Sequence, residues 1–453
     1  MARWLKILTS FLLFSLSANW IVLADPFAPK VDYAADEKPQ AITAADLDGD
    51  GDQDLVVANM GGNTISVIKN NGDATFATKV DYLTGYWPRS IFAADLDADG
   101  DLDLAVANAS GATGETGNMI SILKNNGDGS FAAYTYYEVG QHPTSIAAAD
   151  LDRDGDLDLA VANRFRGIGD LLNNVSVLKN NGDGTFASKV EYEAGESPHS
   201  LSAADFDGDG DFDLAVANYG EFGAGNNVSL LKNNGDGTFA PRTDYPVGQN
   251  PYSLFAADLD GDGYSDLAVA NASSNTISVL QNIGDGTFEA KVDYPTNVNP
   301  ASVFAADLDA NGYLDLAVAN SGLGSGNTIS VLHNNGDGTF AAKVDYSTAQ
   351  EPRSVVASDL DGDGDQDLVT ANWSGNNVSV LKNLAAACTA AKGDMNCDGN
   401  LTPSDVVVML NCVFLGSGNC DLSFSDANCD GGLTAADAVL ELNAVFLGAS
   451  FPC

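Results

Sequence analysis

Cysteine and basic side chains are scarce in this sequence, and each scarcity excludes a class of function. None of the six cysteines lies in the first 387 residues, so neither disulfides nor a cysteine-ligated zinc site can organise most of the chain. Lysine and arginine number 20 against 63 acidic residues, which gives a formal net charge of −43. Such a charge repels nucleic acid and anionic membranes and favours cations as partners.

Catalytic motifs are also lacking. The three histidines, His142, His199 and His333, have no recurrent carboxylate, serine or cysteine neighbour in the sequence, and no Gly-x-Ser-x-Gly turn occurs. The sequence therefore predicts a binding protein and not an enzyme. A component of a polysaccharide-degrading system, such as a hydrolase or lyase with carboxylates that folding brings together, is the alternative.

One long apolar stretch occurs, and it lies at the N-terminus. Arg3 and Lys6 precede apolar residues 7–23, and the segment ends in Val22-Leu23-Ala24, a pattern typical of a signal peptide over residues 1–24. An uncleaved membrane anchor is the alternative, because the stretch is nearly long enough to cross a bilayer. We expect a monomeric, secreted or cell-surface protein that does not contact the membrane after cleavage.

The chain repeats itself about every fifty residues. Seven copies share one order: a short apolar strand, an acidic loop, a second apolar strand, a variable connection, a third strand, an Asn-Gly-Asp-Gly type turn, and a fourth strand that we expect to start at the phenylalanine after the turn, as at Phe131. Four-stranded units of this length with Asn-Gly and Asp-Gly turns predict antiparallel propeller blades.

The two ends of the repeat array predict a closed ring. The seventh copy stops after its third strand, at Asn383, whereas residues 27–33 match the fourth-strand segments 186–192 and 340–346. An N-terminal strand that completes the last blade would remove both exposed edges. The predicted fold is thus an all-β seven-bladed propeller of four-stranded antiparallel blades over residues 25–384, closed by its N-terminal strand.

The acidic loops follow the pattern Asp-x-Asp-x-Asp/Asn-Gly-x-x-Asp. Alternate carboxylates and a bend at the sixth-position glycine predict a calcium site in each loop, with the seventh residue contributing its carbonyl oxygen. The fifth and sixth loops have tyrosine at position 7, and the sixth has Asn311 at position 5, which keeps an oxygen ligand. The expected ligands, at positions 1, 3, 5, 7 and 9, are Asp46, Asp48, Asp50, Asp52 and Asp54; Asp95, Asp97, Asp99, Asp101 and Asp103; Asp150, Asp152, Asp154, Asp156 and Asp158; Asp205, Asp207, Asp209, Asp211 and Asp213; Asp258, Asp260, Asp262, Tyr264 and Asp266; Asp307, Asp309, Asn311, Tyr313 and Asp315; Asp359, Asp361, Asp363, Asp365 and Asp367.

Loops such as residues 258–269, Asp-Leu-Asp-Gly-Asp-Gly-Tyr-Ser-Asp-Leu-Ala-Val, resemble FG-GAP/VCBS repeats, the blades of integrin α-subunit propellers and of many exported bacterial proteins. The resemblance covers roughly residues 26–383. It implies a calcium-clamped propeller with about seven Ca²⁺ ions, used for adhesion or for binding an extracellular glycan or protein.

A second, smaller unit follows a linker over residues 385–392. Residues 393–453 contain two further acidic loops of the EF-hand type, each followed by an apolar helical segment, and they predict two more Ca²⁺ ions. The loop ligands would be Asp394, Asn396, Asp398, Asn400, Thr402 and Asp405, and then Asp426, Asn428, Asp430, Gly432, Thr434 and Asp437.

The duplicated loop and helix resemble type I dockerins, which implies docking to a cohesin-like partner. The alternative is a calcium-stabilised terminal module without a partner. All six cysteines fall in residues 388–453, and the internal symmetry suggests the disulfides Cys388–Cys397, Cys420–Cys429 and Cys412–Cys453, among fifteen possible pairings.

Sequence variation between copies indicates where a ligand would bind. The acidic loops and the Asn-Gly turns share one face and are nearly uniform, whereas the opposite connections differ. There each first strand opens with Pro-x-Ser/Ala, and the variable residue should ring the mouth of a central channel. The candidate ligand-binding residues are Arg89, His199, Tyr252, Arg353 and the nearby Trp87 and Trp373. The alternative is that these are ordinary surface residues.

Overall fold

The computed structural model describes residues 26–109, 118–164, 173–220 and 226–384. The expected signal peptide (1–24), linker (385–392) and dockerin-like module (393–453), with its two calcium loops and its disulfides, lie outside the described residues. Within the described ranges, no helix has the length and apolar character that a membrane crossing requires.

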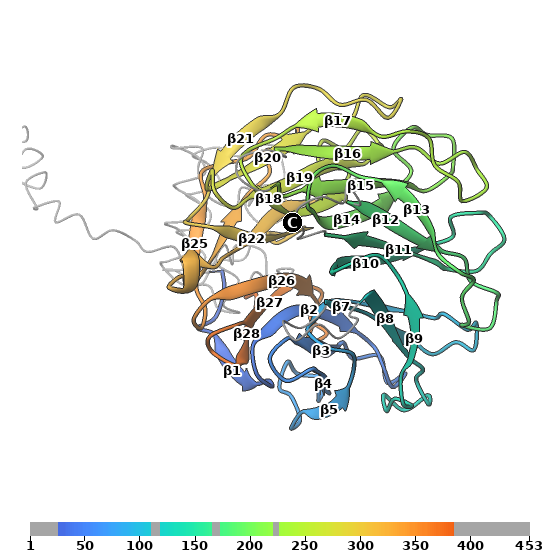
Figure 1. Ribbon diagram of the computed structural model, residues 1–453. Coiled ribbons are helices and arrows are strands. Elements are labelled where there is room, and N and C mark those ends of the chain that lie inside the picture. Colours follow the sequence, from blue (N-terminus) through green and yellow to red (C-terminus); the bar gives the residue numbers. More distant parts are fainter. Residues whose placement is uncertain (1–25, 110–117, 165–172, 221–225, 385–453) are drawn as a thin grey trace, which may run out of the picture.

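The described chain forms seven four-stranded antiparallel sheets around a common centre (Figure 1). The first strands of the blades are β2 (Pro39–Ala45), β6 (Pro88–Ala94), β10 (Pro143–Ala149), β14 (Pro198–Ala204), β18 (Pro251–Ala257), β22 (Pro300–Ala306) and β26 (Pro352–Ser358). The second strands are β3 (Asp54–Asn59), β7 (Asp103–Ala109), β11 (Asp158–Asn163), β15 (Asp213–Asn218), β19 (Asp266–Asn271), β23 (Asp315–Asn320) and β27 (Asp367–Asn372).

The third strands are β4 (Thr64–Ile68), β8 (Asn118–Leu123), β12 (Asn174–Leu178), β16 (Asn227–Leu231), β20 (Thr276–Leu280), β24 (Thr328–Leu332) and β28 (Asn377–Leu381). The outer strands are β5 (Val80–Leu83), β9 (Thr135–Glu138), β13 (Val190–Glu193), β17 (Thr243–Pro246), β21 (Val292–Pro295), β25 (Val344–Ser347) and, in the seventh blade, β1 (Val31–Ala34). A short 3₁₀ turn, η1 (Gly322–Gly324), lies between β23 and β24. We number the blades 1 to 7 by their first strands.

The outer strand starts later than the sequence suggested. It begins at Thr135 in blade 2, and Phe131 instead forms an isolated β-bridge with Asn125. The phenylalanine side chain is buried beneath the neighbouring blade, which leaves three residues of irregular chain before the rim strand. The expected strand was therefore four residues too long at its N-terminal end.

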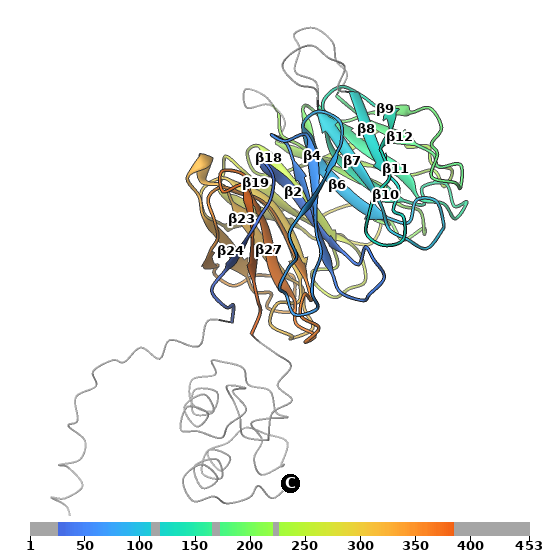
Figure 2. The same ribbon diagram turned by 90° about the horizontal axis from the view of Figure 1, so that it is seen from below.

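The N-terminal strand closes the ring, as predicted. Strand β1 pairs antiparallel with β28, with Val31 opposite Val380 and Ala34 opposite Asn377. The backbone N–H of Leu384 donates to the carbonyl of Pro26 at 2.6 Å, and the two ends of the described chain leave the ring side by side (Figure 2). Blade 7 is thus built from both ends of the repeat array and has four strands like the other blades.

Apolar packing lies between neighbouring blades. The second and third strands are buried almost throughout, because each blade is covered on both faces by its neighbours, while the rim strands are largely exposed. At every blade boundary the rim-strand tyrosine meets the turn phenylalanine of the next blade edge-on, with ring centroids 4.9–5.6 Å apart. Edge-to-face pairs of this kind add about 0.5–1.5 kcal/mol beyond their area burial.

Two sets of hydrogen bonds also tie the blades together. The asparagine that opens each Asn-Gly turn donates Nδ2–H to a loop carbonyl of the preceding blade at 2.7–2.8 Å, and Asn70 and Leu360 make this bond across the closure. Nearer the axis, the serine of the Pro-x-Ser motif accepts a backbone N–H from the next blade at six boundaries. Blade 1 has Ala41 at this position and therefore contributes no serine oxygen to this set. The serine of the motif thus links one blade to the next wherever it is present.

Because the N-terminal segment closes the ring, we expect a buried side chain in this segment to contribute as much to the free energy of unfolding as its equivalent inside the repeat array. Phe27 is 3% exposed and packs against Tyr346, as Phe76 packs against Tyr33 at the next boundary. We expect Phe27→Ala to lower the free energy of unfolding by about 3–5 kcal/mol, because a buried aromatic side chain is lost. Urea titration of Phe27→Ala beside the matched Phe76→Ala variant measures this. A Phe27→Ala variant as stable as the unmodified protein would show that the ring is not closed by this segment.

Candidate functional site

Each acidic loop is held in shape by its first carboxylate. In blade 4, the two oxygens of Asp205 accept the backbone N–H groups of Gly208 at 2.8 Å and of Gly210 at 2.9 Å. The bond from the sixth residue to the first recurs in all seven loops at 2.8–3.1 Å. The sixth-position glycines have φ between 88° and 97°, a region that favours glycine, so the predicted bend is present.

The carboxylates at positions 1, 3 and 5 converge on one point. In four of the loops, those that begin at Asp46, Asp95, Asp150 and Asp205, one oxygen from each lies within 4.8 Å of the others. Three like charges at this separation repel strongly unless a cation lies among them. The expected ligands at these positions are therefore brought together.

One oxygen of the carboxylate at position 3 has the surroundings expected of a metal ligand. In five loops the Oδ1 atom at position 3 is buried and accepts no hydrogen bond from the described residues: Asp48, Asp97, Asp152, Asp207 and Asp361. A buried anionic oxygen without a partner is costly. A cation bound among the loop carboxylates would supply the missing partner.

The second oxygen of the same carboxylate pairs with a lysine that the sequence analysis missed. Lys124 lies 2.7 Å from Asp97 Oδ2, and its Nζ also donates to the carbonyl of Asp183 in the next blade at 2.7 Å. Lys69, Lys179, Lys232 and Lys382 repeat this bridge. The available signal was a lysine directly before the asparagine that follows the third strand in five of the seven repeats. The five blades with this lysine are the five with the buried, unbonded Oδ1.

The ninth position has a structural role in addition to the predicted one. Its carboxylate is buried, and Oδ1 accepts the N–H of the asparagine that opens the turn at 2.6–2.8 Å in every blade. Burial, the largest cause, raises the pKa to about 6 for Asp54, Asp103 and Asp158 and to about 7 for Asp213, Asp266 and Asp367. That these oxygens also bind metal stays a prediction.

The seventh side chain covers the neighbouring turn. A Cβ added to Gly127 would lie 2.8 Å from Asp101 Oδ2, and one added to Gly284 would lie 2.7 Å from the ring of Tyr264. Aspartate and tyrosine therefore occupy equivalent places over the turn glycine. This explains why tyrosine is tolerated at position 7, where the sequence analysis expected a ligand through the backbone alone.

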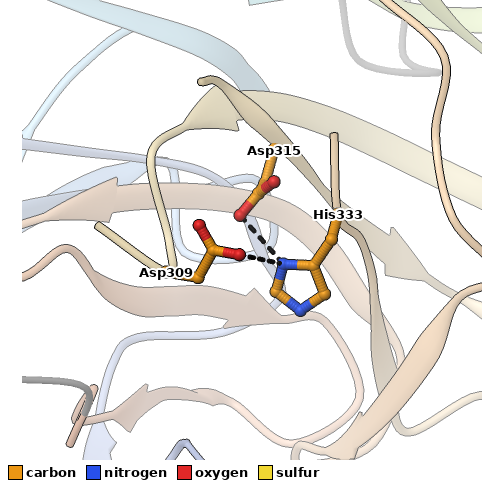
Figure 3. A group of neighbouring side chains, drawn as sticks. All are labelled: Asp309, Asp315 and His333. Carbon is orange, nitrogen blue, oxygen red and sulfur yellow. Dashed lines mark hydrogen bonds and ion pairs between the residues drawn. The ribbon is translucent and has the colours of Figure 1, made fainter. Parts of the chain in front are cut away.

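Blade 6 differs from the others because a histidine stands where most blades have the lysine. His333 Nδ1 lies 3.0 Å from Asp315 Oδ2 and 3.4 Å from Asp309 Oδ2 (Figure 3). Hydrogen bonding to Asp315 is the main cause that raises the pKa of His333. In blade 5 the same place holds Gln281, 3.2 Å from Asp260 Oδ2. Loops 5 and 6 are thus the least uniform candidate metal sites.

The six candidate ligand-binding residues lie at or beside the other end of the inner strands. His199 is 7% exposed, its ring lies 3.8 Å from that of Tyr252, and its Nδ1 is 2.7 Å from the Tyr252 carbonyl oxygen. Arg353 lies 5.3 Å from the ring of Trp373. Burial lowers the pKa of His199 well below 6.5, and the positive charges of Arg164, Arg89 and Arg353 lower it further.

Arg164 and Tyr219 belong to the same group. The Arg164 guanidinium lies 5.0 Å from the ring of Tyr219, which is 5.8 Å from that of His199. Trp87, directly before β6, is half-buried at a positive φ of 55°, and its backbone N–H donates to Asn63 Oδ1 at 3.0 Å. Arg164 directly follows β11, as Tyr219 follows β15 and Trp373 follows β27. Comparing the residue directly after the second strand across the seven copies would have identified Arg164 from the sequence.

Comparisons with known proteins agree with this architecture. A family model described as FG-GAP-like repeat matches residues 27–106, 108–161, 167–216, 205–269, 258–318 and 308–370, and a second, described as FG-GAP repeat, matches residues 142–185. No curated protein sequence shows significant similarity to the chain.

Among solved structures, BBS1N in complex with ARL6DN is similar at 13% identity and a TM-score of 0.54, covering 79% of this chain and 96% of that one. Virginiamycin B lyase from Staphylococcus aureus is similar at 15% identity and a TM-score of 0.53, covering 79% and 99%. A lectin of Agrocybe aegerita, with specific recognition of non-reducing terminal N-acetylglucosamine, has 20% identity and a TM-score of 0.49, covering 80% and 97%. At these identities the likeness extends to the fold alone.

The buried carboxylates at position 9 predict that the metal-free protein loses stability as the pH rises. Their folded-state pKa values of about 6 to 7 lie above the ordinary 3.8. The folded protein therefore holds protons that the unfolded chain has released, so this contribution is complete below pH 3.8 and is lost as the pH rises through about 7. We expect melting temperatures in chelator to fall between about pH 5 and about pH 8. A melting temperature that rises over this interval would contradict the assignment.

Proposed function

Because the chain belongs to the FG-GAP-like repeat family, we propose that it is a calcium-binding recognition protein. Calcium ions in the acidic loops stabilise the ring, and the opposite face binds an extracellular glycan or protein. The observation that carries the calcium assignment is the buried Oδ1 atom at loop position 3, which accepts no hydrogen bond in five blades. In this proposal the rigid ring of blades holds the variable connections of the opposite face in place for binding.

The donor set favours calcium over other cations. Positions 1, 3 and 5 offer carboxylate or amide oxygens, position 7 offers its carbonyl, and position 9 offers a further carboxylate. Calcium accepts six to eight oxygen ligands in flexible geometry, whereas magnesium requires a strict octahedron and keeps its waters. When bound, calcium neutralises the converging carboxylates. The chain's own contribution is to orient these oxygens through the glycine bend and the bonds to the first carboxylate.

The lysine bridge links each such loop to the next blade. In blade 2, Asp97 presents one oxygen to the candidate metal position and the other to Lys124, which reaches the turn of blade 3. Ordering of the loop by calcium would therefore also order the blade boundary. Recognition at the opposite end is supported by His199, whose ring lies 3.8 Å from that of Tyr252 and whose pKa is lowered by the charges of three arginines as well as by burial.

Export and docking are further parts of the proposal. Residues 1–24 have the composition of a signal peptide, and FG-GAP repeats are typical of extracellular proteins. Residues 393–453 would bind two more calcium ions and dock to a cohesin-like partner through the duplicated loop-and-helix pattern.

Calcium addition is expected to raise the melting temperature, and chelation is expected to lower it. Binding to the folded state alone stabilises it by about 2.7 kcal/mol per site at a hundredfold excess over Kd, and extracellular sites have Kd values of about 10⁻⁴–10⁻³ M. Asp97→Ala should remove one calcium equivalent in a calorimetric titration, because it takes both side-chain oxygens at position 3 out of one loop.

Two controls separate the metal site from the ion pair. Lys124→Met breaks the Asp97 ion pair but keeps every loop oxygen, so the calcium stoichiometry should not change. Glu193→Gln removes an exposed carboxylate at the rim and should behave like the unmodified protein. An unchanged melt in excess chelator, or an Asp97→Ala variant with full stoichiometry, would remove calcium from the proposal.

A further inference from the structure

Blade 6 has a histidine beside its acidic loop, at the place where five blades have a lysine. His333 directly follows β24, and Asp315 opens β23. Leu332 and Leu316, which precede and follow them, are antiparallel partners, so strand pairing places His333 beside Asp315. The lysine of the other blades is long enough to pass this carboxylate and reach the next blade, as Lys124 does. The shorter imidazole stays among the carboxylates of its own loop.

The boundary after blade 6 offers no equivalent partner to a lysine. In the five blades with the lysine, its ammonium group donates to the carbonyl of the turn aspartate in the next blade, as Lys382 does to Asp73. Blade 7 has no Asn-Gly-Asp-Gly turn, because the repeat pattern ends at Asn383. The side chain that follows β24 is therefore not needed for a bridge of this kind and is available for another role.

Three side chains converge beside this loop (Figure 3). His333 Nδ1 lies 3.0 Å from Asp315 Oδ2 and 3.4 Å from Asp309 Oδ2, and one ligand atom from each residue lies within 4.8 Å of the others. Tetrahedral zinc binds nitrogen and oxygen at about 2.0–2.2 Å, which sets its ligand atoms about 3.3–3.6 Å apart. A small opening of the shorter contact would therefore admit the ion.

Backbone bonds hold the Asp315 carboxylate in this orientation. Its Oδ1 accepts the N–H of Asn334 at 2.7 Å, and its Oδ2 accepts the N–H of Leu308 at 3.3 Å. Supporting bonds of this kind orient metal-binding carboxylates and tune the ions that they hold. One ligand of the group is therefore positioned before any ion arrives.

Asp309 differs from its counterparts at loop position 3. Its side chain is 37% exposed, whereas the five that pair with lysine are 14–19% exposed. Among the described residues, the buried and unbonded Oδ1 occurs in those five and not in Asp309. An imidazole stands beside Asp309 in place of the fixed ammonium group, and its side chain is 29% exposed. Solvent, and an ion in it, can therefore reach both groups.

We propose that His333, Asp309 and Asp315 bind a divalent transition metal such as Zn²⁺, with water in the fourth position. Imidazole nitrogen suits zinc, whereas calcium takes oxygen ligands. The neutral imidazole would bind through Nδ1 and keep its proton on Nε2, which points away from both carboxylates (Figure 3). The inference goes beyond the proposed calcium function and concerns one loop. Because Asp309 and Asp315 are also expected calcium ligands, zinc and calcium would exclude each other in blade 6.

Titration of the full chain with zinc chloride tests this inference, in calcium well above the expected Kd of the loops. We expect one zinc equivalent to bind in calorimetry and a calcium indicator to report the release of one ion. His333→Gln introduces the side chain that Gln281 has in blade 5. It should weaken this zinc site at least about a hundredfold, because the loss of a supporting bond to a ligand alone costs roughly 10–100-fold.

Matched controls separate this site from other zinc ligands. His142→Asn removes another partly exposed histidine, and asparagine tolerates the positive φ of 48° at that position, so zinc affinity should not change. His333→Lys introduces the residue of the five lysine blades and should abolish the site. Cobalt in place of zinc gives a further readout, because a thiolate-to-cobalt absorption band would place the metal at the C-terminal cysteines. Melting curves in calcium identify any variant that fails to fold.

The outcomes separate this inference from the proposed function. Equal zinc affinity of the unmodified protein and His333→Gln overturns the inference, as does a cobalt spectrum with thiolate bands that His333→Gln leaves unchanged. Calcium uptake without any zinc uptake that depends on His333 overturns the inference and leaves the calcium function standing. Zinc uptake that depends on His333, in a protein that takes up no calcium, supports the inference and overturns the calcium function.

Discussion

Convergence of carboxylates at a single point in each repeat is the constraint on which the rest of the structure depends. In the loops that begin at Asp46, Asp95, Asp150 and Asp205, the charges at positions 1, 3 and 5 lie within 4.8 Å of one another, and bonds to the first carboxylate fix the backbone in that shape. A cation bound among these carboxylates would compensate their repulsion. Because each loop also bonds to the adjacent blade, the compensation is coupled to the assembly of the ring.

The coupling runs through a small set of repeated contacts. An asparagine reaches back to the preceding blade, a lysine reaches forward to the next, and a tyrosine and phenylalanine pair edge-on at the rim. Repetition makes every boundary nearly equivalent, including the one between the first and last repeats. With one end of the ring devoted to this function, the other end is free to vary, and it is there that arginine and aromatic side chains gather.

Much of the fold could be predicted from the sequence because short local motifs define each strand and turn of the repeat. The strand order follows from Asn-Gly turns and apolar runs, and closure follows from the match between residues 27–33 and the later rim segments. The start of the rim strand was misplaced because Phe131 belongs to a buried bridge and not to the strand. Local pattern does not reveal which neighbour covers a side chain.

The candidate sites likewise divide into residues that are close in the sequence and residues that only the fold brings together. The loop ligands lie within nine residues of one another, so their meeting was predictable, whereas the role of Lys124 depends on the next blade. Arg89, Arg164 and Arg353 are far apart in the sequence, and only the closed ring brings them near His199. Sequence variation indicated the end of the propeller at which these residues lie, whereas the contact of Arg164 with Tyr219 crosses a blade boundary and depends on the fold.

The most direct test of the central claim is an anomalous difference map from crystals grown with calcium. The account predicts a peak in each acidic loop, and in blades 1, 2, 3, 4 and 7 the peak should lie in contact with the buried Oδ1 of Asp48, Asp97, Asp152, Asp207 and Asp361. Loops that keep this shape with no peak beside those oxygens would contradict it.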